Sequence, residues 1–184
     1  MEKQNVSKTI EQYYEIDSTI QSKNQLIFKN TYPYNQTSYI EILNYPNRHY
    51  WDSKKVKGGF KSNDTIIKNG NLNFDHKMIY SKVKLTKNQA KKLFQTLHNI
   101  ECINDMTAAC FDPRDMIVFY DKNNKPFEYI EICFGCSYYR GGEKVPTISL
   151  CPSKTKLIIN ELANFGLKRG DFNEIEHKLL EKYK

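Results

Sequence analysis

The alternation of apolar and polar residues predicts a β-hairpin in the middle of the chain, over about 115–134. Two apolar runs are separated there by a polar stretch, and we expect the turn to be centred on Asn123-Asn124. Strands joined in this register place Ile117 opposite Ile130.

Both faces of this predicted hairpin are largely apolar. One face carries Ile117, Phe119, Ile130 and Ile132. The other carries Met116, Val118, Tyr120, Phe127 and Tyr129, with Tyr120 opposite Phe127. Two apolar faces are typical of an interior strand pair that is covered on both sides, or covered on one side and used for a partner on the other.

Apolar residues at helical spacing predict three helices. We expect them at about 86–99, 154–165 and 172–182. Thr86 and Gln89 have the spacing of a capping box, so the first helix begins there. Ser153 is placed to cap the second helix, and Gly166 follows its last turn, where a left-handed residue is favoured.

The remaining strand signals are shorter. We expect strands at 25–29, 38–45, 77–85 and 147–150. The pair Asn69-Gly70 predicts a second, tight hairpin. The segment 47–64 reads as an exposed loop or loose hairpin, and 137–146 reads as a loop.

The order of these elements indicates the fold class. Strands, a helix, a hairpin, a strand and two helices follow one another without β-α-β alternation, which favours an α+β fold on a mostly antiparallel sheet. A chain of 184 residues is typical of one domain, so we take 1–184 as a single domain. The first 22 residues could form an amphipathic helix, and 1–24 could be a loosely attached N-terminal segment.

The charge of the chain is unevenly distributed. The net charge is +7, yet residues 71–100 hold six basic and one acidic residue, whereas 101–150 hold five basic and eight acidic ones. Lysine predominates and no Arg-rich or Gly-rich tract is present, so nucleic-acid binding is not favoured over a solvated lysine surface. The basic first half instead suits an acidic protein partner.

The sequence also bears on location. No run approaches the roughly 18 apolar residues of a membrane span, and the first residues lack the apolar core of a signal peptide. This N-terminus predicts a cytoplasmic protein. A periplasmic or lipid-anchored protein is the alternative if a leader segment has been removed.

Five cysteines are the main candidates for chemistry. The hairpin register places Cys110 opposite Ser137, next to Cys136. A zinc site could use Cys110, Cys133, Cys136 and Cys151. The C-x-x-C pair is followed by no helix signal, which disfavours thioredoxin-like chemistry. A disulfide from Cys110 to Cys133 or Cys136 is expected if the protein is exported, and otherwise the cysteines pack as small apolar residues.

Arg114 is a further candidate residue, because the same register places it opposite Cys133. It could clamp an anion or stabilise a thiolate. The alternative, which we favour, is a salt bridge at the base of the hairpin, with Asp112 and Asp115 nearby in sequence.

The motif C-x-x-P-R-x-x-I-V-F-Y-D followed by Y-I-x-I-C-F-x-C resembles the core of an uncharacterised bacterial family. It comprises Cys110, Pro113, Arg114, 117–121, Tyr129, Ile130 and 132–136. Members often look like secreted proteins or lipoproteins, so the resemblance implies a location in the cell envelope. It implies no activity.

No signature of a hydrolase, kinase or nucleotide-binding protein occurs in the sequence. We therefore lean against an enzyme and expect a non-catalytic protein-binding or inhibitory module, similar in role to an immunity protein, without a cofactor. The alternative is a cysteine-centred metal-binding or redox protein, for which zinc is the expected metal.

Overall fold

A five-stranded antiparallel sheet is the centre of the fold. A computed structural model describes residues 20–22, 26–56, 59–62, 65–103 and 111–181. The strand order is β11-β10-β9-β2-β7. The strands are β2 (Tyr39–Asn44), β7 (Ser81–Lys84), β9 (Asp115–Tyr120), β10 (Pro126–Cys133) and β11 (Tyr138–Gly141). The α+β fold predicted from the sequence is confirmed.

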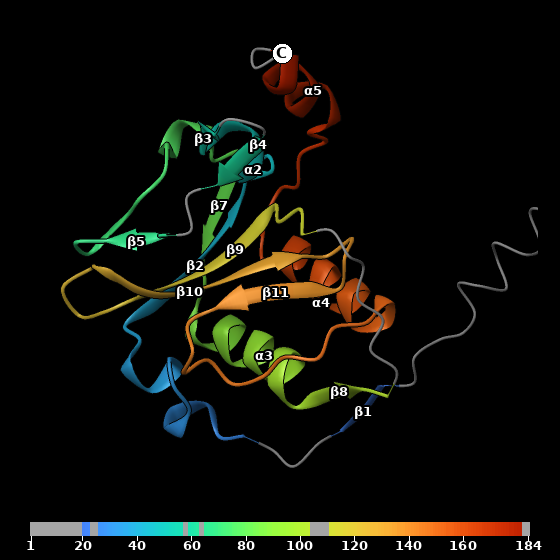
Figure 1. Ribbon diagram of the computed structural model, residues 1–184. Helices are drawn as coiled ribbons and strands as arrows, with labels where there is room; N and C mark the ends of the chain where they lie inside the picture. Colours follow the sequence, from blue (N-terminus) through green and yellow to red (C-terminus); the bar gives the residue numbers. More distant parts are fainter. Residues whose placement is uncertain (1–19, 23–25, 57–58, 63–64, 104–110, 182–184) are drawn as a thin grey trace, which may run out of the picture.

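Two long helices cover one face of the sheet. Helices α3 (Lys87–His98) and α4 (Pro152–Asn164) pack side by side there, while α5 (Asn173–Glu181) lies at the end of the sheet near α2 (Arg48–Trp51) (Figure 1). All three predicted helices are confirmed. None of the helices in the described part of the chain is long and apolar enough to cross a membrane.

Among the described residues, the smaller elements form three strand pairs and three 3-10 turns. The pairs are β1 (Ile20–Ser22) with β8 (Ile100–Cys102), β3 (Ser53–Val56) with β4 (Gly59–Ser62), and β5 (Ile67–Lys68) with β6 (Asn71–Leu72). The turns are η1 (Phe28–Asn30), η2 (Tyr34–Gln36) and η3 (His76–Met78). The β5–β6 hairpin confirms the Asn-Gly signal, because Asn69 and Gly70 have φ of 52° and 70°.

The register of the β9–β10 hairpin agrees with the prediction except beside the turn. Ile117 lies opposite Ile130, as expected. The turn, however, encloses three residues, 122–124, and Tyr120 lies opposite Pro126. A bulge at Phe127 then restores the register. The predicted pairing of Tyr120 with Phe127 is therefore wrong, and Phe127 packs on the helix-covered face.

Each face of the hairpin joins a separate apolar core. The core under the helices includes Ile40, Ile42, Leu93, Phe94, Leu97, Ile117, Phe119, Ile130, Ile132, Ile158 and Leu162. The core on the second face is formed by Leu43, Tyr45, Ile66, Met116, Val118 and Tyr120, with Trp51 and Phe74 packed against it. Of the two arrangements expected for the hairpin, the structure has the one in which both sides are covered.

Several of the shorter elements differ from the prediction. At 25–29 the described residues contain the start of η1 and no strand. The segment 147–150 is not a strand, because the Ile148 N–H donates to the Tyr139 hydroxyl group at 3.1 Å, outside any ladder. The predicted loop 137–146 contains β11, which extends the sheet.

Two helix ends show why local signals succeed or fail. Gly166 has φ of 96° and the Leu167 N–H donates to the Leu162 carbonyl group, so the predicted left-handed stop of α4 is confirmed. Helix α4 begins earlier than predicted, at Pro152 with Cys151 as N-cap. Proline is favoured in the first turn, which moves the cap away from Ser153.

The N-terminal prediction falls mostly outside the described residues. Residues 1–19 are not described, and Ile20–Ser22 pair with Ile100–Cys102 as a strand. For these three residues the predicted helix over 1–22 is wrong.

The core under the helices generates a stability prediction. Leu97 is fully buried, so Leu97→Ala removes contacts that its neighbours cannot replace. We expect the free energy of unfolding to fall by about 2–5 kcal/mol, measured by chemical denaturation. The exposed Gln95→Ala on the same helix is the control, with an expected change within about 0.5 kcal/mol. Equal effects of the two substitutions would contradict this core.

Candidate functional site

The structure pairs four of the five cysteines differently from the prediction. Cys102 is bonded to Cys151 and Cys133 to Cys136, with Cα–Cα distances of 6.0 and 5.3 Å. The expected disulfide from Cys110 to either cysteine of the C-x-x-C pair is thus replaced by a bond within that pair, since the turn after β10 brings the two together. Cys110 itself lies outside the described residues.

The predicted zinc ligands are not assembled among the described residues. Cys151 is bonded to Cys102, and within the described ranges no group of three His, Cys, Asp or Glu side chains could hold a metal ion. Zinc therefore stays a prediction, as does the expectation of no cofactor. All four bonded cysteines are buried.

Arg114 forms a salt bridge, although with an unexpected partner. The β9–β10 ladder ends at Asp115 opposite Ile132, so Arg114 lies beyond the last strand pair. Its guanidinium group donates to Glu176 of α5 at 2.8 and 2.6 Å. This bond attaches α5 to the end of the sheet.

Asp115, the carboxylate next to Arg114 in sequence, pairs with other residues. Its carboxylate accepts hydrogen bonds from Arg169 at 2.7 Å and from Asn44 at 2.9 Å. Burial raises the pKa of Asp115, whereas Arg169 opposes that shift. The buried carboxylate is thus paired, as an ionised group inside a protein must be.

A second buried ion pair was not predicted from the sequence. Arg48 begins helix α2, in the segment expected to be an exposed loop or loose hairpin, yet it is buried. The hairpin alternative is confirmed by β3 and β4, which follow the helix. It donates through Nε to Glu131 Oε1 at 2.7 Å and through Nη2 to Oε2 at 3.1 Å. The Tyr45 hydroxyl group donates to the same carboxylate at 2.9 Å. The pair fixes α2 against the second face of the sheet.

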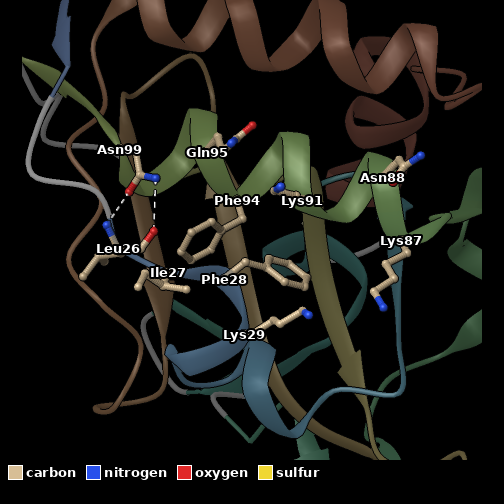
Figure 2. Close-up of a pocket in the computed structure, with 10 residues that line it drawn as sticks. All are labelled: Leu26, Ile27, Phe28, Lys29, Lys87, Asn88, Lys91, Phe94, Gln95 and Asn99. Atoms are coloured by element: carbon tan, nitrogen blue, oxygen red, sulfur yellow. Dashed lines mark hydrogen bonds between the residues drawn. The ribbon is translucent and has the colours of Figure 1, made fainter.

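The candidate site is a groove between Leu26–Lys29 and helix α3, hereafter the α3 groove (Figure 2). It encloses about 470 Å³. From α3 it is lined by Lys87, Asn88, Lys91, Phe94, Gln95 and Asn99, the last being the residue that caps the helix.

Hydrogen bonds hold the segment Leu26–Lys29 against the helix. The Leu26 N–H donates to Asn99 Oδ1 at 3.0 Å, and Asn99 Nδ2 donates to the Leu26 carbonyl group at 3.3 Å. One amide side chain thus satisfies both backbone groups of Leu26, as a neighbouring strand would. The segment needs no strand partner, which explains why the strand predicted at 25–29 is not formed.

The interior of the groove is aromatic. The Phe28 and Phe94 rings meet edge to face with centroids 5.4 Å apart. Phe28 also lies 5.3 Å from the Tyr34 ring. Beside them, Leu26 and Ile27 are 41% and 61% exposed, so two consecutive large aliphatic side chains face solvent.

The charge around the groove has one sign. Lys29, Lys87 and Lys91 line it, and none of its ten lining residues is acidic. In Figure 2 the Lys87 side chain lies at the end opposite Asn99, and the Lys29 side chain lies below Phe28. A smaller cavity of about 240 Å³ shares Phe28 and Lys87 with the groove and continues around the start of α3. No acidic residue occurs in the first turn of that helix, whose dipole adds positive potential.

Comparison of the chain with protein-family models, with curated proteins and with solved structures finds no match. The resemblance to a bacterial family stays a prediction, and the function is argued from the geometry alone.

His98, behind the groove, generates a pH prediction. Burial, and then the neighbouring Lys154 ammonium group, lower the pKa of His98 to about 3 from 6.5. Its Nε2 lies 2.9 Å from the Tyr34 hydroxyl group. Between pH 6.5 and about 3, the His98 imidazole is protonated in the unfolded chain and neutral in the folded chain. The stability that is present above pH 6.5 is therefore lost progressively as the pH falls through this interval.

Denaturation at a series of pH values tests this. We expect the free energy of unfolding to fall by up to about 1.4 kcal/mol per pH unit below pH 6.5 from His98 alone. His98→Gln should flatten the profile over that interval. A profile of unchanged slope in the variant would show that His98 titrates normally.

Proposed function

We propose that the protein is a non-catalytic binding module that captures an acidic segment of a partner protein in the α3 groove. The observation that carries this is the combination, in one groove, of exposed aliphatic side chains with three lysines and no acidic residue. A segment with one apolar side chain and flanking carboxylates is complementary to both features.

The apolar part of the groove would provide the affinity. Exposed aliphatic side chains gain about 25 cal/mol for each Å² of apolar surface that a partner covers. The side chains of Leu26 and Ile27 form such a surface, and the Phe28–Phe94 pair lies next to it. Scattered apolar residues are ordinary on a protein surface, whereas neighbours lining one groove indicate a contact site.

The lysines would orient the partner and accelerate its approach. Lys29, Lys87 and Lys91 all line the groove, and its lining holds no carboxylate. A surface of one sign attracts an oppositely charged partner before contact. This supports the acidic partner expected from the composition.

The groove would also bind with little rearrangement. The two hydrogen bonds from Asn99 hold Leu26, and the Thr31 hydroxyl group donates to the Ile27 carbonyl group at 2.9 Å. A segment fixed in advance loses less conformational entropy on binding. If the captured segment belongs to the working surface of the partner, binding inhibits that partner, as an immunity-like protein does.

The two disulfides support an oxidising location for this binding. Disulfides persist in secreted and periplasmic proteins and are rare in the cytoplasm. This favours the periplasmic or lipid-anchored alternative over the cytoplasm. Because the bonded cysteines are buried, they also favour the binding module over a cysteine-centred redox protein.

A peptide titration followed by nuclear magnetic resonance tests the proposal. The probe is a five-residue peptide with a central leucine between glutamates, and the same peptide with lysines is its control. We expect shifts confined to Leu26–Lys29 and α3 for the acidic peptide alone. Lys91→Glu, which reverses a charge of the groove, should weaken binding about tenfold or more, equivalent to about 1.4 kcal/mol.

Lys122→Glu is the matched control, because Lys122 is exposed in the β9–β10 turn and does not line the groove. We expect its affinity to stay within about twofold of the unaltered protein, which corresponds to about 0.4 kcal/mol. Equal losses of affinity in the two variants, or chemical-shift changes spread over all lysines, would contradict the proposal. The lysines would then be ordinary solvated surface residues.

A further inference from the structure

A second opening lies at the β11 edge of the sheet. Tyr138 and Arg140 line it from the second face, and Tyr139 and Val145 line it from the helix-covered side. This cleft, hereafter the β11 cleft, encloses about 590 Å³, within the range of small-molecule sites. Glu131 lies opposite both Met116 and Arg140 in the ladders, so Arg140 shares the face of the second core. The apolar residues of the second core cover the middle of this face of the sheet, and the cleft lies open beside them.

The chemistry of the cleft differs from that of the α3 groove. Eight of its twelve lining residues carry a charge or a hydroxyl group, and Ile66 and Val145 are its two aliphatic residues. Such a surface suits a ligand rich in hydroxyl groups better than an apolar peptide side chain.

The rim of the cleft is fixed by the Glu128 carboxylate. It accepts hydrogen bonds from the Gly142 N–H at 3.2 Å and from the Tyr32 hydroxyl group at 2.9 Å. A Cβ atom on Gly142 would lie 2.2 Å from Glu128 Oε2, so a side chain at this position would displace the Glu128 carboxylate. These hydrogen bonds hold Gly142, one of the residues that line the cleft.

The two arginines of the cleft are in different electrostatic states. Arg48 is bonded to Glu131 and Asp52, which neutralise it. Within the described residues Arg140 has no carboxylate at ion-pair distance, and its guanidinium carbon lies 4.3 Å from the centre of the Phe111 ring. The contact with Phe111 holds Arg140 in place, and its guanidinium group forms no ion pair with the described residues.

A small polar cavity of about 110 Å³ adjoins Arg140 and would admit an anionic group. Asn47 and His49 line it, and it shares Arg48, Glu131 and Arg140 with the cleft. Next to this position, Tyr138 is 44% exposed and its ring meets Phe111 edge to face at 5.5 Å. An exposed tyrosine offers an apolar ring face together with a hydroxyl group.

We infer that the β11 cleft binds a sugar acid, a pyranose ring that carries a carboxylate. Arg140 pairs with the carboxylate, because a guanidinium group matches its two oxygens. The Tyr138 ring packs against the C–H face of the sugar. Glu143 and Thr147, which also line the cleft, exchange hydrogen bonds with its hydroxyl groups. This site is separate from the α3 groove and does not depend on the function proposed for it.

Titration of the whole chain with glucuronate, followed by nuclear magnetic resonance, tests the inference. Glucose, which lacks the carboxylate, is the control ligand. We expect glucuronate to shift the amides of Tyr129, Arg140 and Gly142. Arg140→Gln should weaken this binding roughly tenfold or more, equivalent to about 1.4 kcal/mol, because the hydrogen bonds to the carboxylate are lost. Lys144→Gln is the matched control, because it removes an exposed cation outside the lining.

Three outcomes would overturn the inference. Glucose could bind as well as glucuronate, the two variants could lose equal affinity, or no amide of the cleft could shift. If the acidic peptide shifts these amides and glucuronate does not, the cleft is a protein-binding surface instead. Peptide binding at the α3 groove is read from different amides, so either proposal can fail without the other.

Discussion

Strand β9 is buried along its whole length, and this burial on both faces is the constraint on which the rest of the structure depends. Hydrogen bonds to β10 and β2 fix it at the centre of the sheet. Helices α3 and α4 cover one face, while small elements around Tyr45, Trp51 and Phe74 cover the other. At its start Asp115 must be paired, and Arg169 and Asn44 do this from two other segments.

Because the centre of the sheet is closed, the openings lie at its periphery. The α3 groove borders the helix layer and carries lysines with apolar neighbours, whereas the β11 cleft lies beyond the second core and carries both signs of charge. Their different chemistry would let two ligands bind without competing. The wall of the cleft depends on the Arg48–Glu131 pair, and loss of Arg48 would leave the buried Glu131 carboxylate without an ion-pair partner among the described residues.

The sequence predicted the elements whose signals are local. The helices, the Asn69-Gly70 turn and the hairpin register follow from periodicity and turn chemistry. Phe127 was misplaced because a three-residue turn and a bulge compensate each other, which leaves no trace in the pattern. The sequence does not predict the buried Arg48, because its partner Glu131 lies 83 residues away. It does not predict the groove, because Asn99, which holds Leu26, lies 73 residues from it. Cysteine pairing likewise depends on tertiary contacts, as Cys102 with Cys151 shows.

Native-state hydrogen exchange tests most directly the claim that a doubly covered strand holds the fold while binding occurs at the edges. We predict that the amides of Met116–Phe119 exchange only through global unfolding, with the highest free energy of opening in the chain. The amides of Leu26–Lys29 and Gly141–Gly142 should open locally at lower free energy. Exchange of the β9 amides at a free energy well below that of global unfolding would contradict the account.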